Sequence, residues 1–112
     1  MTILKKNIAI CAYGTVGKVL TKFILGNKDY IDNIKFVCTL KKDSEHKNIK
    51  EMYSRLEIPV YENINVNNDQ FKNALLENNV DIVFLLWWPT IVKQESINLA
   101  NIGFVNLHPS LL

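Results

Sequence analysis

The chain has few of the residue types that define several common protein classes. Among its 112 residues there are two cysteines, three prolines, four glycines and, apart from Arg55, no arginine. Cys11 and Cys38 both lie inside apolar runs, and no CxxC or histidine cluster accompanies them. Two such cysteines are too few for a disulfide framework, so we expect buried fillers, no metal site and a reducing compartment, the cytoplasm.

Long apolar runs and strong charge of one sign are also lacking. The apolar run at residues 8–12 is much shorter than a signal-peptide core, and no segment approaches the roughly 20 apolar residues of a membrane span. The net charge is only +2 and the lysines are scattered, whereas nucleic-acid surfaces usually cluster lysine and arginine. With 48% hydrophobic and 21% charged residues, the composition is typical of one soluble globular domain with no membrane partner.

Apolar residues recur with two alternating periods along the chain. Runs typical of buried strands lie at residues 7–12, 34–39, 59–61, 81–86 and 104–107. Gly26 is expected to end a first helix, Asn68 to cap a third, and residues 96–100 to form a short fourth. The apolar stripes of the first three helices are Val16, Val19, Leu20, Phe23 and Ile24; Ile49, Met52, Tyr53 and Leu56; and Phe71, Ala74 and Leu75.

Strands that alternate with helices over short connections predict a parallel sheet with right-handed crossovers and helices on both faces. The expected architecture is an open, Rossmann-like α/β sheet with strand order 3-2-1-4-5. In such sheets ligands bind outside the carboxyl ends of the strands, near the reversal between the first and fourth. Residues 13–17, 87–91 and 108–112 should therefore meet at one crevice.

The last residues place two polar side chains at the end of the fifth strand. Asn106 and His108 are two positions apart, so in extended backbone they project to the same face, about 7 Å apart. Pro109 lacks an N–H and should end the strand near His108, which presents the imidazole in a loop. Either residue alone is more often structural, but an amide and a titratable ring at a strand end are suited to catalysis.

Residues 103–112 resemble the folate-dependent formyltransferase family, in which a strand ending Gly-x-(Ile/Val)-Asn-x-His-Pro-Ser-Leu-Leu carries the active site. The resemblance extends more loosely over residues 1–112, as the amino-terminal part of that family's catalytic domain. It implies an enzyme that transfers a formyl group from 10-formyltetrahydrofolate to an amine. It also implies that Asn106 donates to the oxyanion, and that His108 adds positive charge or relays a proton.

The family also uses an aspartate that lies downstream of this motif, beyond residue 112. By this resemblance the domain is incomplete at its carboxyl-terminal end and inactive without the missing segment. An open apolar sheet edge tends to be covered by another chain, so self-association into a homo-oligomer is expected.

The resemblance assigns ligands to two further loops. In the family, backbone after the fourth strand helps to hold the pterin-like ring of the folate, and the loop after the first strand contacts the acceptor's phosphate in some members. The expected cofactor-binding residues are Trp88, Pro89, Thr90 and Ile91. The expected substrate-binding residues are Tyr13, Gly14, Thr15 and Ser110.

The acceptor amine is inferred by comparing the first loop with those of family members. The loop lacks the Gly-x-Gly-Ser/Thr-Asn pattern of glycinamide ribonucleotide enzymes and only partly matches the Gly-Thr-Pro pattern of methionyl-tRNA enzymes. A small-molecule acceptor, the amine of a nucleotide-linked amino sugar, is therefore favoured, with methionyl-tRNA as the alternative. A formyltetrahydrofolate hydrolase is disfavoured because no regulatory domain precedes the first strand.

A different class of function has to be weighed against formyl transfer. Residues 12–17 approximate the dinucleotide fingerprint Gly-x-Gly-x-x-Gly with alanine in the first place, which keeps an NADP-binding domain or a non-catalytic ligand-binding fragment as alternatives. Lys41 and Lys42 follow the second strand where an acidic residue would bind a ribose, so only a phosphorylated ribose fits. His46, at the start of the second helix, is expected to be solvated.

Overall fold

Five parallel strands form the sheet of this chain, whose computed structural model describes residues 6–31 and 33–107. The strand order is β3-β2-β1-β4-β5, which confirms the predicted Rossmann-like α/β fold. The strands are β1 (Ile8–Ala12), β2 (Ile34–Thr39), β3 (Val60–Glu62), β4 (Ile82–Leu86) and β5 (Gly103–Leu107).

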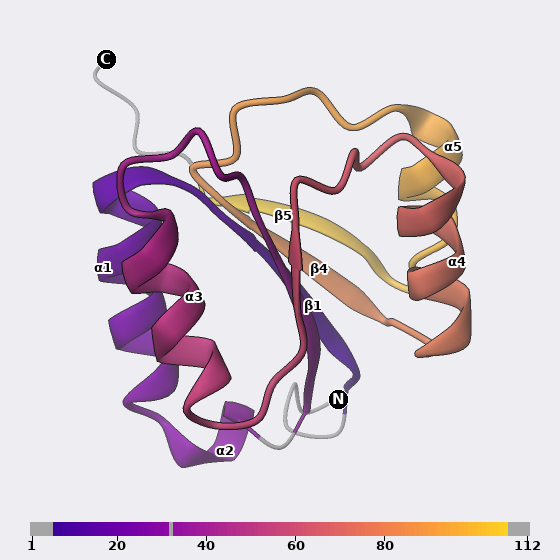
Figure 1. Ribbon diagram of the computed structural model, residues 1–112. Coiled ribbons are helices and arrows are strands. Elements are labelled where there is room, and N and C mark those ends of the chain that lie inside the picture. Colours follow the sequence, from indigo (N-terminus) through magenta and orange to yellow (C-terminus); the bar gives the residue numbers. More distant parts are fainter. Residues whose placement is uncertain (1–5, 32, 108–112) are drawn as a thin grey trace.

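Helices cover both faces of the sheet. Helices α1 (Gly14–Leu25) and α3 (His46–Ser54) lie on one face, and α4 (Asp69–Glu77) and α5 (Gln94–Ile97) lie on the other (Figure 1). A one-turn helix, α2 (Lys28–Ile31), was not predicted, and α5 begins two residues before its expected start. None of the helices in the described ranges is long and apolar enough to cross a membrane.

The two faces of the sheet pack two separate apolar clusters because side chains alternate along each strand. Cys11 and Cys38 are cross-strand neighbours on the α4 and α5 side, and both are free and buried, as predicted. Burial raises the pKa of the Cys38 thiol well above its ordinary value, and a hydrogen bond with Cys11 adds to the effect. Both cysteines are core fillers, and the Cys38 thiol has little thiolate character.

The apolar stripe predicted for α1 is only partly buried. Val19 and Phe23 are 55% and 77% exposed, whereas Gly17 and Thr21 face the core. A Cβ on Gly17 would lie 3.1 Å from the Leu86 carbonyl oxygen, so the helix axis approaches the sheet at this point. Thr21 is fully buried because its hydroxyl is hydrogen-bonded to Tyr53 at 2.8 Å. The real contact face of α1 is therefore centred on small and polar residues.

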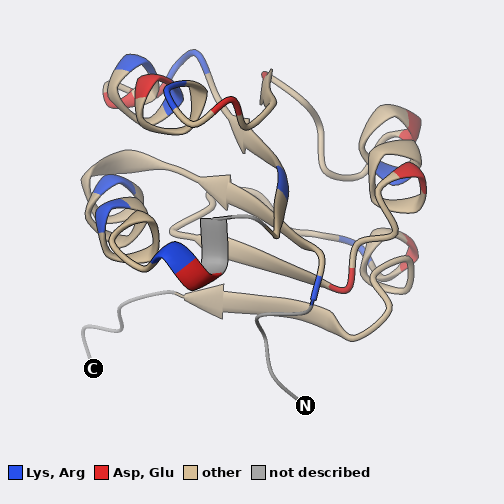
Figure 2. Cartoon of the chain, turned by 90° about the horizontal axis from the view of Figure 1, so that it is seen from below, with Lys and Arg blue, Asp and Glu red and all other residues tan. Residues whose placement is uncertain are grey.

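Two other local predictions are confirmed and one is wrong. Gly26 is the C-cap of α1, and the Asn68 side chain caps α4 by accepting from the Phe71 N–H at 3.1 Å. His46 is not solvated, since its side chain is 13% exposed and its Nε2 lies 2.7 Å from Glu62 Oε2. Figure 2 shows that most charged residues lie on helices and loops, which leaves the strands nearly uncharged.

Candidate active site

A cavity of about 410 Å³ lies on the α4 and α5 side of the sheet, where β4 and β5 meet the loop that follows β4. Its lining joins residues that the sequence predicted separately, Asn106 as a catalytic group and residues 88–91 as cofactor contacts. The lining residues are Leu85, Trp88, Pro89, Thr90, Ile91, Val92, Ile97, Phe104 and Asn106. None of these side chains ionises, so the cavity is an apolar pocket with a few hydrogen-bonding groups.

Asn106 reaches the cavity from β5. It pairs in register with Leu85 of β4, and it shares a face of the strand with Phe104, which packs against Phe71 of α4. The Asn106 side chain is exposed and makes no hydrogen bond to any residue in the described ranges. Its amide is therefore held at the cavity by the sheet and is available to a ligand.

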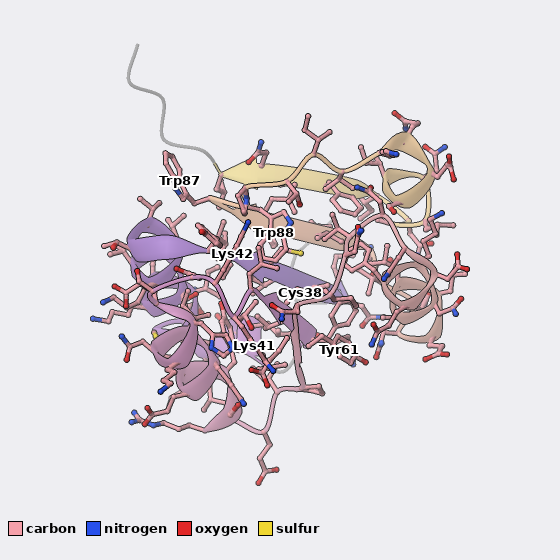
Figure 3. All side chains as sticks on the ribbon, turned by 45° about the horizontal axis from the view of Figure 1, so that its top comes forward. Cys38, Lys41, Lys42, Tyr61, Trp87 and Trp88 are labelled. Carbon is pink, nitrogen blue, oxygen red and sulfur yellow. The ribbon has the colours of Figure 1, made fainter. Side chains whose placement is uncertain are left out.

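The two tryptophans after β4 point apart. Trp87 has a φ of +60°, a left-handed conformation that is uncommon for a bulky residue, and its N–H donates to the Leu107 carbonyl at 3.2 Å. Figure 3 shows Trp87 toward α1 and Trp88 over the middle of the sheet, beside Lys42. Trp88 is 7% exposed, and its Nε1 has no hydrogen-bond partner among the described residues.

The loop after β4 is anchored by a residue that the sequence did not single out. Asn67 Nδ2 donates to the Ile91 carbonyl at 2.8 Å, and Asn67 Oδ1 accepts from the Lys93 N–H at 2.7 Å. The NH₂ group and the oxygen of the Asn67 side chain therefore both hold the backbone of the loop that carries the expected cofactor contacts. Asn67 lies in a polar connection with three other asparagines, so no sequence signal separates it from its neighbours.

The loop after β1 is occupied by acidic side chains. The buried Asp43 carboxylate accepts from the Gly14 N–H at 2.8 Å, although 29 residues separate them. Glu45 binds Lys18 at 3.1 Å and the Thr15 side chain, and its pKa is lowered, chiefly by a hydrogen bond from Asn48. These carboxylates lie where a phosphate would approach the helix N-terminus. A substrate role for Tyr13, Gly14 and Thr15 stays a prediction.

Two of the expected site residues, His108 and Ser110, lie outside the described residues. Their roles in catalysis and substrate binding stay predictions. Among the residues that are described, no group of three or more His, Cys, Asp or Glu side chains could hold a metal ion.

The arrangement suits a flat ligand with polar edges. Trp88, Phe104, Leu85 and Ile97 provide apolar contact, and the Asn106 amide supplies hydrogen bonds at a defined place. An amide N–H at the rim of an apolar cavity can stabilise an oxyanion that develops on a ligand there.

Comparison with known proteins gives partial matches. No protein-family profile matches the chain. The chain is 34% identical over 55 residues to the methionyl-tRNA formyltransferase of Buchnera aphidicola subsp. Acyrthosiphon pisum (strain Tuc7), which covers 49% of this chain and 18% of that protein. It is 32% identical over 63 residues to the same-named protein of Buchnera aphidicola subsp. Baizongia pistaciae (strain Bp), covering 56% and 20%. The chain thus spans about a fifth of the length of these relatives.

Proposed function

We propose that this protein transfers a formyl group from 10-formyltetrahydrofolate to an amine. One observation carries the proposal: Asn106 and residues 88–91, which come from separate parts of the sequence, line the same cavity. The partial similarity to methionyl-tRNA formyltransferases supports the same chemistry.

In the proposed reaction the acceptor amine attacks the formyl carbon, and a tetrahedral intermediate with an oxyanion forms. The Asn106 amide N–H donates to that oxygen, an interaction whose loss costs roughly 2.7 to 4 kcal/mol at comparable sites. The intermediate collapses when the bond between the formyl carbon and the folate nitrogen breaks. The amine proton is then carried to that nitrogen, a transfer for which His108 is our candidate.

Two acceptors remain candidates for the amine. The names of the relatives favour methionyl-tRNA over the nucleotide-linked amino sugar that the first loop led us to expect. We therefore propose the α-amino group of methionyl-tRNA as the first acceptor to test and the amino sugar as the second.

The NADP-binding alternative is less well supported. A dinucleotide's pyrophosphate would need the N–H groups at the start of α1, and Asp43 already accepts from Gly14 there. A buried carboxylate at this position repels a phosphate.

Binding and turnover together test the proposal. The whole protein is titrated with 5-formyltetrahydrofolate and with NADPH while its melting temperature and tryptophan fluorescence are followed. We expect the folate to raise the melting temperature and quench Trp88, and NADPH to do neither. Formyl transfer is then measured with 10-formyltetrahydrofolate and each acceptor. Tight NADPH binding without folate binding would overturn the proposal.

A further inference from the structure

A second cavity, of about 460 Å³, adjoins the first and shares Trp88 and Thr90 with it. It lies between the ends of β2 and β3 on the side of the sheet that α4 and α5 cover, and the proposed reaction does not use it. Its lining residues are Leu40, Lys42, Asn63, Ile64, Asn65, Asn67, Trp88 and Thr90.

Local hydrogen bonds decide which amide atoms this second cavity offers to a ligand. Asn63 Oδ1 accepts from the Lys41 N–H at 2.7 Å, and Asn65 Oδ1 accepts from the Asn67 N–H at 2.8 Å. A backbone N–H only donates, so the atom facing it must be the amide oxygen in both side chains. The NH₂ groups of Asn63 and Asn65 therefore remain as donors for a ligand, since neither donates to any other described residue.

Two other side chains of this lining, Lys42 and Trp88, also present hydrogen-bond donors. Among the described residues, Lys42 has no ion-pair partner and the buried Trp88 indole N–H has no hydrogen-bond acceptor. The lining holds no Asp or Glu side chain. A pocket that combines an ammonium, two amide NH₂ groups and an indole N–H, with no carboxylate to repel a ligand, is complementary to anionic oxygen.

We propose that the second cavity binds an anionic oxygen group, a carboxylate or a phosphate, through Lys42, Asn63, Asn65 and Trp88. The site itself does not depend on the proposed function, but the identity of its ligand does. Because the two cavities share a wall, one source is a carboxylate on the tail of a folate whose ring lies in the first cavity. The other source is a phosphate of the acceptor.

Asparagine-to-aspartate substitutions separate binding from folding. Asn65→Asp keeps an oxygen for the Asn67 N–H and replaces the free NH₂ group by a negatively charged oxygen. Asn63→Asp does the same for the Lys41 N–H, and aspartate tolerates the φ of +61° at this position. Asn73→Asp, on the exposed surface of α4, adds the same charge away from the cavity and is the matched control.

Isothermal titration of the whole protein uses three probes: 5-formyltetrahydrofolate, a tetrahydropterin without the benzoylglutamate tail, and inorganic pyrophosphate. At least one anionic probe should bind the unsubstituted protein. We expect Asn65→Asp, Asn63→Asp and Lys42→Ala each to raise the Kd of that probe by about tenfold or more, because charge-assisted hydrogen bonds are lost or replaced by repulsion. Trp88→Phe should weaken it less, and Asn73→Asp should leave it unchanged. The tailless pterin should bind equally to all aspartate variants.

The pattern across probes identifies the source. Weakened binding of the tailed folate with unchanged pterin binding supports the site and assigns it to the folate carboxylate. Weakened binding of pyrophosphate supports the site and assigns it to a phosphate, even if no folate binds and the proposed function fails. If neither anionic probe binds, or if the cavity variants and Asn73→Asp behave alike, the proposal is overturned, whether or not the protein transfers formyl groups.

Discussion

The loops that follow β1 and β4 lie next to each other at the carboxyl edge of the sheet, but their polar groups are used differently. After β1, the Gly14 N–H and the Thr15 side chain bind carboxylates of Asp43 and Glu45. After β4, the Trp88 indole N–H has no described partner, and two cavities open beside it. In the loop after β1 the donors are bonded to carboxylates of the protein, so we call it the closed loop. In the loop after β4 the Trp88 indole N–H has no partner among the described residues, so we call it the open loop.

This difference shows why the topology of the sheet alone does not locate a binding site. Both loops lie at the switch point where ligands of such sheets bind. Unused hydrogen-bonding groups in a partly buried setting separate the two, because a buried donor without a partner carries a desolvation cost that a ligand can relieve.

The largest expected effect is on turnover, at Asn106 of β5, which lies beside the loop after β4. Asn106→Ala in the whole protein should lower kcat by about 100-fold, equivalent to about 2.7 kcal/mol of transition-state stabilisation. Folding should be nearly unchanged, because the side chain is exposed and bonds to no described residue. Steady-state kinetics beside Asn73→Ala checks this, and unchanged turnover would remove Asn106 from the mechanism.

Substitution of Asp43, which bonds to the closed loop after β1, should lower the free energy of unfolding. Asp43→Ala removes a buried carboxylate that accepts from the Gly14 and Glu45 N–H groups, at 2.8 and 3.0 Å, and should lower the free energy of unfolding by about 2 to 3 kcal/mol. Asp43→Asn keeps one acceptor and should lose less. Urea unfolding measures both variants. If both match the unsubstituted chain, the loop is not held closed by this carboxylate.

A third carboxylate, that of Asp81, holds the amino-terminal edge of the sheet together, and its contribution to stability can be measured as a function of pH. Asp81 accepts from Asn101 Nδ2 and from the Asn7 N–H, and these bonds, Asn101 first, lower its pKa below the ordinary 3.8. Because the folded pKa is the lower one, the carboxylate stabilises the fold above about pH 4, and this contribution is lost as pH falls through the folded pKa.

Asp81→Asn should therefore flatten the acid side of the profile of melting temperature against pH. Asp69→Asn, on the exposed start of α4, is the control substitution. An identical acid limb in Asp81→Asn and the unsubstituted chain would show that the bonds to Asp81 do not contribute to stability.

The smallest stability effect is expected for Trp88. Trp88→Phe removes an indole N–H that has no described partner, so only the packing of the larger ring is lost, and the free energy of unfolding should change by less than about 1 kcal/mol. Thermal unfolding measures this change. A loss comparable to that of Asp43→Ala would show that the indole N–H is bonded within the fold and is not kept for a ligand.

The strands were predictable because local pattern determines them. The apolar runs around Ile10, Val37 and Val83 gave β1, β2 and β4 within one residue at either end, and the Asn68 cap gave the start of α4. These features depend on neighbours in sequence. The nearness of Asn106 to the loop after β4 follows from the pairing of β4 with β5, and so from the same local information, whereas a catalytic role for Asn106 stays a prediction.

The contacts of α1 and of the first loop were not predictable in the same way. Val19 and Phe23 fit the helical period, but the helix is rotated so that Gly17 and Thr21 face the sheet, since only small side chains fit where the axis approaches β4. The bond from Gly14 to Asp43 joins positions 29 residues apart in a loop without periodicity. Such contacts follow from three-dimensional packing.

The close approach at Gly17 has a consequence for the entropy of binding. The backbone of α1 packs directly against the end of β4 at Gly17 and Leu86, and such close packing restricts their relative motion. The floor beneath the ligand is therefore already ordered before anything binds. Under the proposed function, a ligand beside Trp88 would have to immobilise little more than itself and the loop that Asn67 tethers, which would leave more of the interaction free energy for affinity.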